Sequence, residues 1–136
     1  MDKVSPVAIA GTGIVSAIGD NRAECLAALA AGCAGIDDIR LLDSAHRGRL
    51  PVAEVKHPDA ELAAMAGVDE AAGRTALLAL IAAREALESA RLPDLGKWRT
   101  GLISANTVGG MDRTEQFFAQ GARGKLRDVV RHECGW

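Results

Sequence analysis

The stretch AIAGTGIVSAIGDN, from Ala8 to Asn21, places three glycines between a short apolar run and a polar segment that can begin a helix. The run from Pro6 to Ala10 ends at a glycine, which is typical of a strand buried on both faces of a parallel sheet. Asn21 is a good N-cap, Glu24 follows three residues later as in a capping box, and Gly32 offers a left-handed C-cap. The sequence therefore predicts a buried strand, a glycine turn and a helix.

Glycine turns of this kind also bind the phosphates of nucleotides. Gly11, Gly13 and Gly19 do not form G-x-G-x-x-G, because Ser16 stands three residues after Gly13. The T-G-x-x-x-[GA]-x-G loop of short-chain dehydrogenases fits better, but those enzymes need a catalytic tyrosine and this sequence contains none. A nucleotide-binding oxidoreductase fragment stays as one alternative.

Two further segments complete the predicted order of elements. Residues 52–56 alternate as in an edge strand or hairpin arm, and a long helix is expected from about Asp69 to Arg91. Gly101 to Ala105 reads as a second buried strand that opens into a glycine-containing loop. Strands that alternate with helices in this way predict an α/β layered protein.

Composition restricts the class of protein. The 136 residues, of which 49% are hydrophobic, are enough for one globular unit, and no uninterrupted apolar window is long enough to span a bilayer. We therefore expect a cytoplasmic protein that binds no membrane, since Asp2 and Lys3 are also not followed by a long apolar run that leads to a cleavage site. The net charge of −2 is not basic enough for a protein that binds nucleic acid. Cys25, Cys33 and Cys134 lack paired spacing, so each is interpreted as a small buried hydrophobe rather than a disulfide or zinc ligand.

The segment His132-Glu133-Cys134 is the strongest apparent chemical cluster. On a helix, residues two apart point to nearly opposite sides, so His132 would face away from the Cys134 thiol. The spacing also does not bring metal ligands together. Neither a nucleophile nor a metal site is predicted here.

Residues 7–36, 74–92 and 99–112 together resemble the N-terminal part of the β-ketoacyl-acyl carrier protein synthases, which are thiolase-fold condensing enzymes. The similarity includes the G-x-G-[IV]-[VI]-[ST]-x-[IL]-G turn at Gly11 to Gly19, Ala34-Gly35-Ile36 after an A-L-x-x-G helix end, and the A-x-x-E-A-L helix at Ala82 to Leu87. Residues 1–136 are accordingly expected to be the N-terminal fragment of a β-ketoacyl synthase thiolase-fold domain. The resemblance implies an α/β fold of buried strands with packing helices, and a glycine turn that is structural and holds no nucleotide.

The resemblance also implies a reaction. In this family an active-site cysteine takes an acyl chain from a carrier protein as a thioester, which a decarboxylating malonyl unit then attacks. The expected protein is a 3-oxoacyl-acyl carrier protein synthase of fatty-acid or polyketide synthesis, without a cofactor, and a homodimer or heterodimer when complete. The family's T-A-C-type turn and its later histidines and lysine have no match here, so we assign no catalytic residue and expect the chain alone to be inactive. A non-catalytic chain-length-factor subunit is the other alternative.

Two sets of binding residues are expected. In the family, the hydrophobic residue before the paired glycines lies near the acyl pocket, so Val108, Gly109 and Gly110 are candidates for substrate binding. The family commonly carries basic residues before the long helix, where the acidic carrier protein docks, but this sequence offers only Arg74 there. A later basic segment is therefore the candidate docking surface. It consists of Arg123, Lys125, Arg127 and Arg131.

Overall fold

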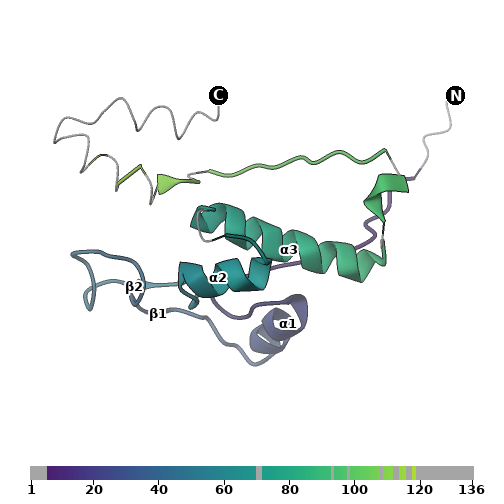
Figure 1. The fold of residues 1–136 in the computed structure, drawn as a ribbon. Coiled ribbons are helices and arrows are strands. Elements are labelled where there is room, and N and C mark those ends of the chain that lie inside the picture. Colours follow the sequence, from purple (N-terminus) through teal and green to yellow (C-terminus); the bar gives the residue numbers. More distant parts are fainter. Residues whose placement is uncertain are drawn as a thin grey trace, which may run out of the picture. The chain divides into compact units, whose positions relative to one another are not determined.

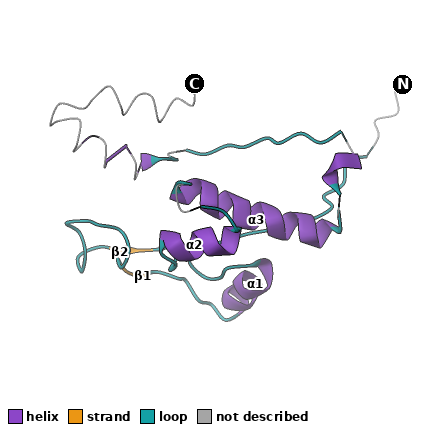
Figure 2. Cartoon of the chain, in the orientation of Figure 1, coloured by secondary structure: helices purple, strands orange, loops and turns teal. Residues whose placement is uncertain are grey.

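A computed structural model of the protein describes residues 6–69, 72–92, 94–97, 99–107, 109–111, 114–115 and 118 (Figure 1). The elements follow the order α1 (Arg22–Ala30), β1 (Asp37–Asp38), β2 (Pro51–Val52), α2 (Asp59–Ala66), α3 (Arg74–Ala90) and a 3-10 helix, η1 (Leu95–Lys97). Figure 2 shows that helices and loops dominate the described part. The chain divides into one unit of residues 1–58 and 79–100 and a second of residues 59–78 and 101–136.

Helix α1 has the two caps that the sequence predicts. The Asn21 side chain accepts a hydrogen bond from the Glu24 N–H at 3.0 Å, and the Glu24 carboxylate accepts the Asp20 N–H at 2.8 Å. Gly32 has φ +71°, and its N–H and that of Cys33 close the helix on the carbonyls of Leu29 and Ala28. The Asn21 N-cap and the glycine C-cap are thus confirmed, and the capping box is confirmed in part, because Glu24 accepts the N–H of Asp20 and the side-chain NH2 of Asn21 instead of the backbone N–H of Asn21.

The predicted hairpin arm is confirmed in part. Strand β2 pairs antiparallel with β1, with Asp37 opposite Val52 and Asp38 opposite Pro51. Ile39 follows β1 and is buried, and it contributes to the core of the first unit together with Cys25 and Ile81. The pairing ends after two residues, so residues 53–56 do not continue the strand.

Helix α2 was not predicted, and the long helix is shorter than predicted. The core of the second unit consists of Leu62, Ala63 and Ala66 on α2 and Leu77 on α3, all buried. The side chains of Arg74 and Asp59 form an ion pair at 2.6 Å beside them. Gly67, with φ +67°, ends α2 in the left-handed conformation, and α3 begins only at Arg74.

The two segments predicted as buried strands are extended and exposed. Residues 6–10 and 101–105 have no strand assignment, and Val7 and Ile103 are each 98% exposed. A parallel strand needs neighbours whose backbone groups complete its ladder, and within the described ranges neither segment has such a neighbour. The prediction of buried strands is wrong for this structure, and the thiolase-like layers are not shown by it.

Within the residues that the structure describes, no helix is both long enough and apolar enough to cross a bilayer.

Candidate functional site

The glycine turn lies against the C-terminal half of α3. A Cβ placed on Gly11 would lie 2.1 Å from the Ala86 carbonyl oxygen, and a Cβ on Gly13 would lie 2.0 Å from that of Ala82. No side chain fits at either position without a backbone shift. The glycines therefore allow the turn to approach the backbone of α3 closely at Ala82 and Ala86.

Glu85, on the same stretch of α3, binds the turn through its carboxylate. Oε2 accepts the backbone N–H of Ile14 at 2.9 Å, and Oε1 accepts that of Arg22, the first residue of α1, at 2.8 Å. These two hydrogen bonds hold the pKa of Glu85 below its usual range, and the bond from Arg22 has the larger effect. The carboxylate occupies the helix N-terminus that would otherwise attract an anion.

Ser89 adds a third polar contact between α3 and the turn. Its hydroxyl oxygen accepts the N–H of Thr12 at 2.9 Å and lies 3.2 Å from the Thr12 carbonyl oxygen. The turn is therefore held to α3 by close contact between backbones at Gly11 and Gly13 and by hydrogen bonds along the stretch from Thr12 to Arg22.

The end of the turn is closed by a short hairpin. Backbone hydrogen bonds join Ser16 and Gly19, and the Ser16 hydroxyl lies 3.1 Å from the thiol sulfur of Cys25. Cys25 is only 3% exposed, which confirms that it is a buried hydrophobe, whereas Cys33 is exposed and that prediction is wrong for it. Cys33 is exposed because it follows the Gly32 cap, where the chain leaves the helix.

The Ala34-Gly35-Ile36 segment contacts the same turn. Gly35 has φ +65°, and a Cβ there would lie 2.5 Å from the Ile18 side chain and 3.0 Å from the Ala17 carbonyl oxygen. Glycine is required at this position both by its backbone conformation and by the close approach of the turn.

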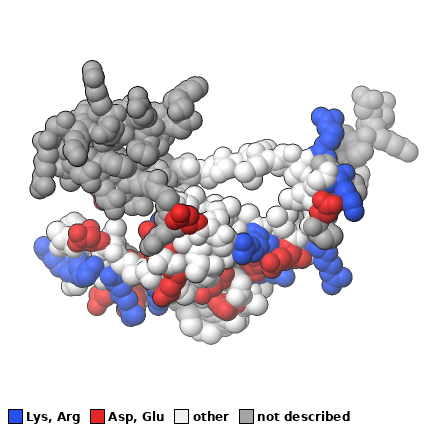
Figure 3. Space-filling view, in the orientation of Figure 1, with Lys and Arg blue, Asp and Glu red and all other residues white. Residues whose placement is uncertain are grey.

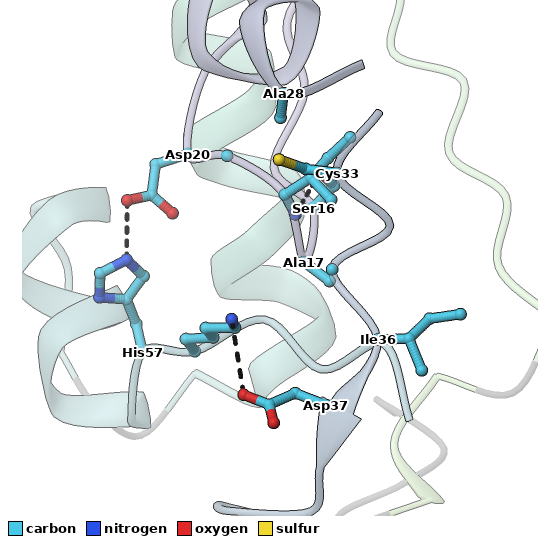
Figure 4. A pocket seen from close by; sticks show the side chains of 12 residues that line it. Ser16, Ala17, Asp20, Ala28, Cys33, Ile36, Asp37 and His57 are labelled. Atoms are coloured by element: carbon cyan, nitrogen blue, oxygen red, sulfur yellow. Dashed lines mark hydrogen bonds and ion pairs between the residues drawn. The ribbon is translucent and has the colours of Figure 1, made fainter. Parts of the chain in front are cut away.

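An open pocket of about 500 Å³ lies between the turn and the segments that follow α1 and β2 (Figure 4). His57 Nε2 is 2.7 Å from the Asp20 carboxylate on one side, and Lys56 lies 3.9 Å from Asp37 on the other. Hydrogen bonding from Asp38, followed by the Arg40 charge, lowers the pKa of Asp37. The lining is Ser16, Ala17, Ile18, Gly19, Asp20, Ala28, Cys33, Gly35, Ile36, Asp37, Lys56 and His57.

The pocket lining is mixed, with Ile18, Ile36 and several small residues beside the charged ones, and each of its two carboxylates lies within 4 Å of a basic side chain. No group of three or more His, Cys, Asp or Glu side chains is placed to hold a metal ion in the described part of the chain. The sequence reasoning did not identify this pocket, because its walls come from three separated segments. The sequence feature that could have indicated the pocket is the A-G-I segment after α1, because Gly35 and Ile36 line it.

The predicted substrate-binding residues fall partly within the described ranges. Gly109 donates its N–H to the Asn106 side chain at 2.9 Å, and Gly110 has φ +82°, so they form a tight turn. Val108 and the basic residues Arg123, Lys125, Arg127 and Arg131 lie outside the described residues, as do His132 and Cys134. The structure does not test their predicted roles.

Comparison with known proteins found no matching family model, no matching curated protein and no matching solved structure.

Proposed function

We propose that this chain forms the N-terminal part of a β-ketoacyl-acyl carrier protein synthase. The observation that carries the proposal is the convergence of the sequence pieces that resemble the family. Ala82, Glu85 and Ala86 of the A-x-x-E-A-L helix contact the glycine turn, as does Ser89 just beyond that motif. Gly35 of the A-G-I segment contacts the other side of that turn.

This convergence gives a physical reason for the whole pattern. The small residues permit contact between backbones, and the glutamate satisfies two N–H groups that the turn and α1 leave without backbone partners. A phosphate-binding loop needs the opposite arrangement, in which such N–H groups face the ligand. The Glu85 contacts favour a structural turn, and the same relationship supports the condensing-enzyme pattern over the oxidoreductase alternative.

In the proposed enzyme the chain holds the framework and contributes no nucleophile. The reaction requires a cysteine whose sulfur displaces the carrier-protein thiol to form an acyl thioester. Loss of CO2 from a malonyl thioester then gives a carbanion, which attacks that acyl carbon and releases the cysteine. Two N–H donors stabilise the oxyanion in each step. Cys25 is unsuited to this role, because it is buried against Ser16 and the Gly19 carbonyl.

The test begins with the complete reading frame. The encoded protein is expected to contain a T-A-C-type cysteine beyond Trp136 and to convert acyl- and malonyl-carrier protein into 3-oxoacyl-carrier protein and CO2. The 136-residue chain alone should show no condensation. A replacement of that cysteine would indicate the chain-length-factor alternative.

Two results would overturn the proposal. One is a stable acyl thioester on Cys134 of the isolated chain that disappears in Cys134→Ser. The other is calorimetric binding of a nicotinamide dinucleotide to the chain.

A further inference from the structure

Residues 39–50, called the connecting loop from here on, join β1 to β2 and bend at residues 40–42. The Glu54 carboxylate, two residues after β2, accepts the consecutive backbone N–H groups of residues 40, 41 and 42 at 2.9, 3.0 and 2.7 Å. The pairing of β1 with β2 covers only two residues on each strand, so it leaves these N–H groups without a ladder partner. One side chain therefore supplies the acceptors that the short ladder lacks.

The carbonyl groups of the same bend are bound by a side chain of opposite charge. The Arg47 guanidinium donates to the carbonyl oxygens of Arg40 and Leu42 at 3.2 and 3.0 Å. Hydrogen bonds in which one partner is ionised are stronger than those between neutral groups. The backbone of the bend is thus satisfied by one acidic and one basic side chain.

Apolar burial contributes little to the connecting loop. Ile39 is buried at its start, whereas Leu41, Leu42 and Leu50 are 39%, 52% and 52% exposed. Segments with few buried apolar contacts and with hydrogen bonds near solvent open locally at a lower free energy than the whole protein. The contacts of Glu54 and Arg47 therefore decide whether this loop stays closed.

The charges around the bend are mixed in sign. Arg40 forms an ion pair with Asp37, and Lys56 lies 3.9 Å from the same carboxylate. Figure 3 shows acidic and basic side chains beside one another at the β1 and β2 end of the first unit. The remaining charged or titratable groups of the loop and its two strands are Asp38, Asp43, His46 and Arg49.

The segments that Glu54 joins also form walls of the open pocket. Gly35, Ile36 and Asp37 line it just before the bend, and Lys56 and His57 line it just after Glu54. Opening of the bend would release one of these walls from the other and widen the pocket.

We propose that Glu54 is a charge-dependent latch that keeps the connecting loop closed and, through it, these two walls together. Its ionised carboxylate offers acceptors to all three N–H groups, whereas a protonated carboxyl group has less acceptor capacity and adds an O–H donor. The latch is closed at neutral pH and opens as the pH falls through the range in which carboxyl groups titrate, near about 4. This inference does not depend on the function proposed above.

Asp37 responds to acid in the same direction. Its pKa is lowered first by the N–H of Asp38 and then by the charge of Arg40. Its contacts therefore stabilise the fold above the unfolded pKa and are lost as pH falls through the folded pKa. Helix α1 has its own caps and buries Cys25, so it stays folded when the loop opens.

The test is amide hydrogen exchange at neutral pH, expressed as protection factors. Glu54→Gln should lower the protection of the amides of residues 40–42 by at least about tenfold, because a glutamine cannot accept from all three N–H groups. The amides of α1 should change by less than about twofold. Trypsin cleavage after Arg49 should become faster by a similar factor, since cleavage requires the loop to open.

Asp43→Asn is the matched control. Asp43 lies in the same loop and is exposed, and it makes no hydrogen bond or ion pair in the described part of the chain, so the variant removes an equal charge without touching the bend. Unchanged protection in Glu54→Gln, or an equal loss in Asp43→Asn, would overturn the proposal. An equal loss at α1 would also overturn it, because the effect would then be global.

The wild-type protein provides a second test that needs no variant. Lowering the pH from about 7 to about 4 should reduce the protection of residues 40–42 while α1 remains protected. Asp43→Asn should show the same acid response, and Glu54→Gln should show little of it. Protection at the bend that is independent of pH, or that falls only together with that of α1, would rule out the latch.

Discussion

The Glu85 carboxylate accepts the backbone N–H of Arg22 at 2.8 Å, although the two residues are 63 positions apart. The same carboxylate accepts the Ile14 N–H at 2.9 Å. One side chain on α3 therefore fixes both the glycine turn and the first turn of α1, and the N–H groups satisfied in this way keep the pKa of Glu85 low.

Glu85→Gln should lower the free energy of unfolding at neutral pH. A glutamine side chain offers only one oxygen to the two N–H groups. Its NH2 would face the second N–H, so two hydrogen-bond donors would meet there without an acceptor. Because the folded-state pKa lies below the unfolded value of about 4.3, the stabilisation by Glu85 is present above that value and is lost as pH falls through the folded pKa. Urea unfolding at several pH values should show the difference between variant and wild type shrinking in acid.

Glu88→Gln is the matched control, because Glu88 lies on the same helix and is exposed. It should leave the unfolding curves nearly unchanged. An equal effect of both variants would assign the change to the charge of the helix rather than to the contact with the turn.

Gly13→Ala should destabilise the protein by about 3 kcal/mol. The new Cβ would meet the Ala82 carbonyl oxygen 2.0 Å away, so the turn or α3 must move. Gly101→Ala is the control, since a Cβ there has nothing within 4 Å. Thermal unfolding of both variants checks the prediction, and equal melting temperatures would show that the turn does not pack against α3 in solution.

Local signals determined which parts of the fold could be predicted. The Asn21 cap and the Gly32 terminus depend on residues within a few positions of one another, so the sequence was sufficient for α1. Helix α2 was not predicted, although Leu62, Ala63 and Ala66 share helical spacing and Gly67 follows them, because an eight-residue segment rich in alanine shows little contrast between an apolar and a polar face.

The contacts of the turn depend on pairings that no local pattern specifies. Nothing near Ile14 in sequence indicates that its N–H binds Glu85, and the pocket requires His57 to approach Asp20 across 37 positions. The run from Pro6 to Ala10 has the composition of a buried strand, but burial depends on neighbouring strands, which its composition cannot supply.

Leu77→Ala should lower the free energy of unfolding by about 2–4 kcal/mol, because Leu77 is fully buried and its truncation leaves a cavity. Leu80→Ala, on the same helix but exposed, should change it by no more than about 0.5 kcal/mol. Urea denaturation monitored by circular dichroism measures both. Similar losses in the two variants would mean that α3 does not bury the Leu77 face.

Thiol labelling should separate Cys33 from Cys25. The Cys25 sulfur is enclosed by the Ser16 hydroxyl at 3.1 Å and the Gly19 carbonyl at 3.4 Å, whereas Cys33 is exposed beside the pocket. Alkylation of Cys25 therefore requires α1 to open from the turn, and a Cys134→Ser background leaves these two thiols to compare. Iodoacetamide, with the products mapped by mass spectrometry, should modify Cys33 at least about tenfold faster, since opening limits the other site. The rates should converge in denaturant. Equal native rates would mean that the turn does not cover Cys25. Gly13→Ala should move the ratio toward unity, because the turn that covers Cys25 then loses its close contact with α3.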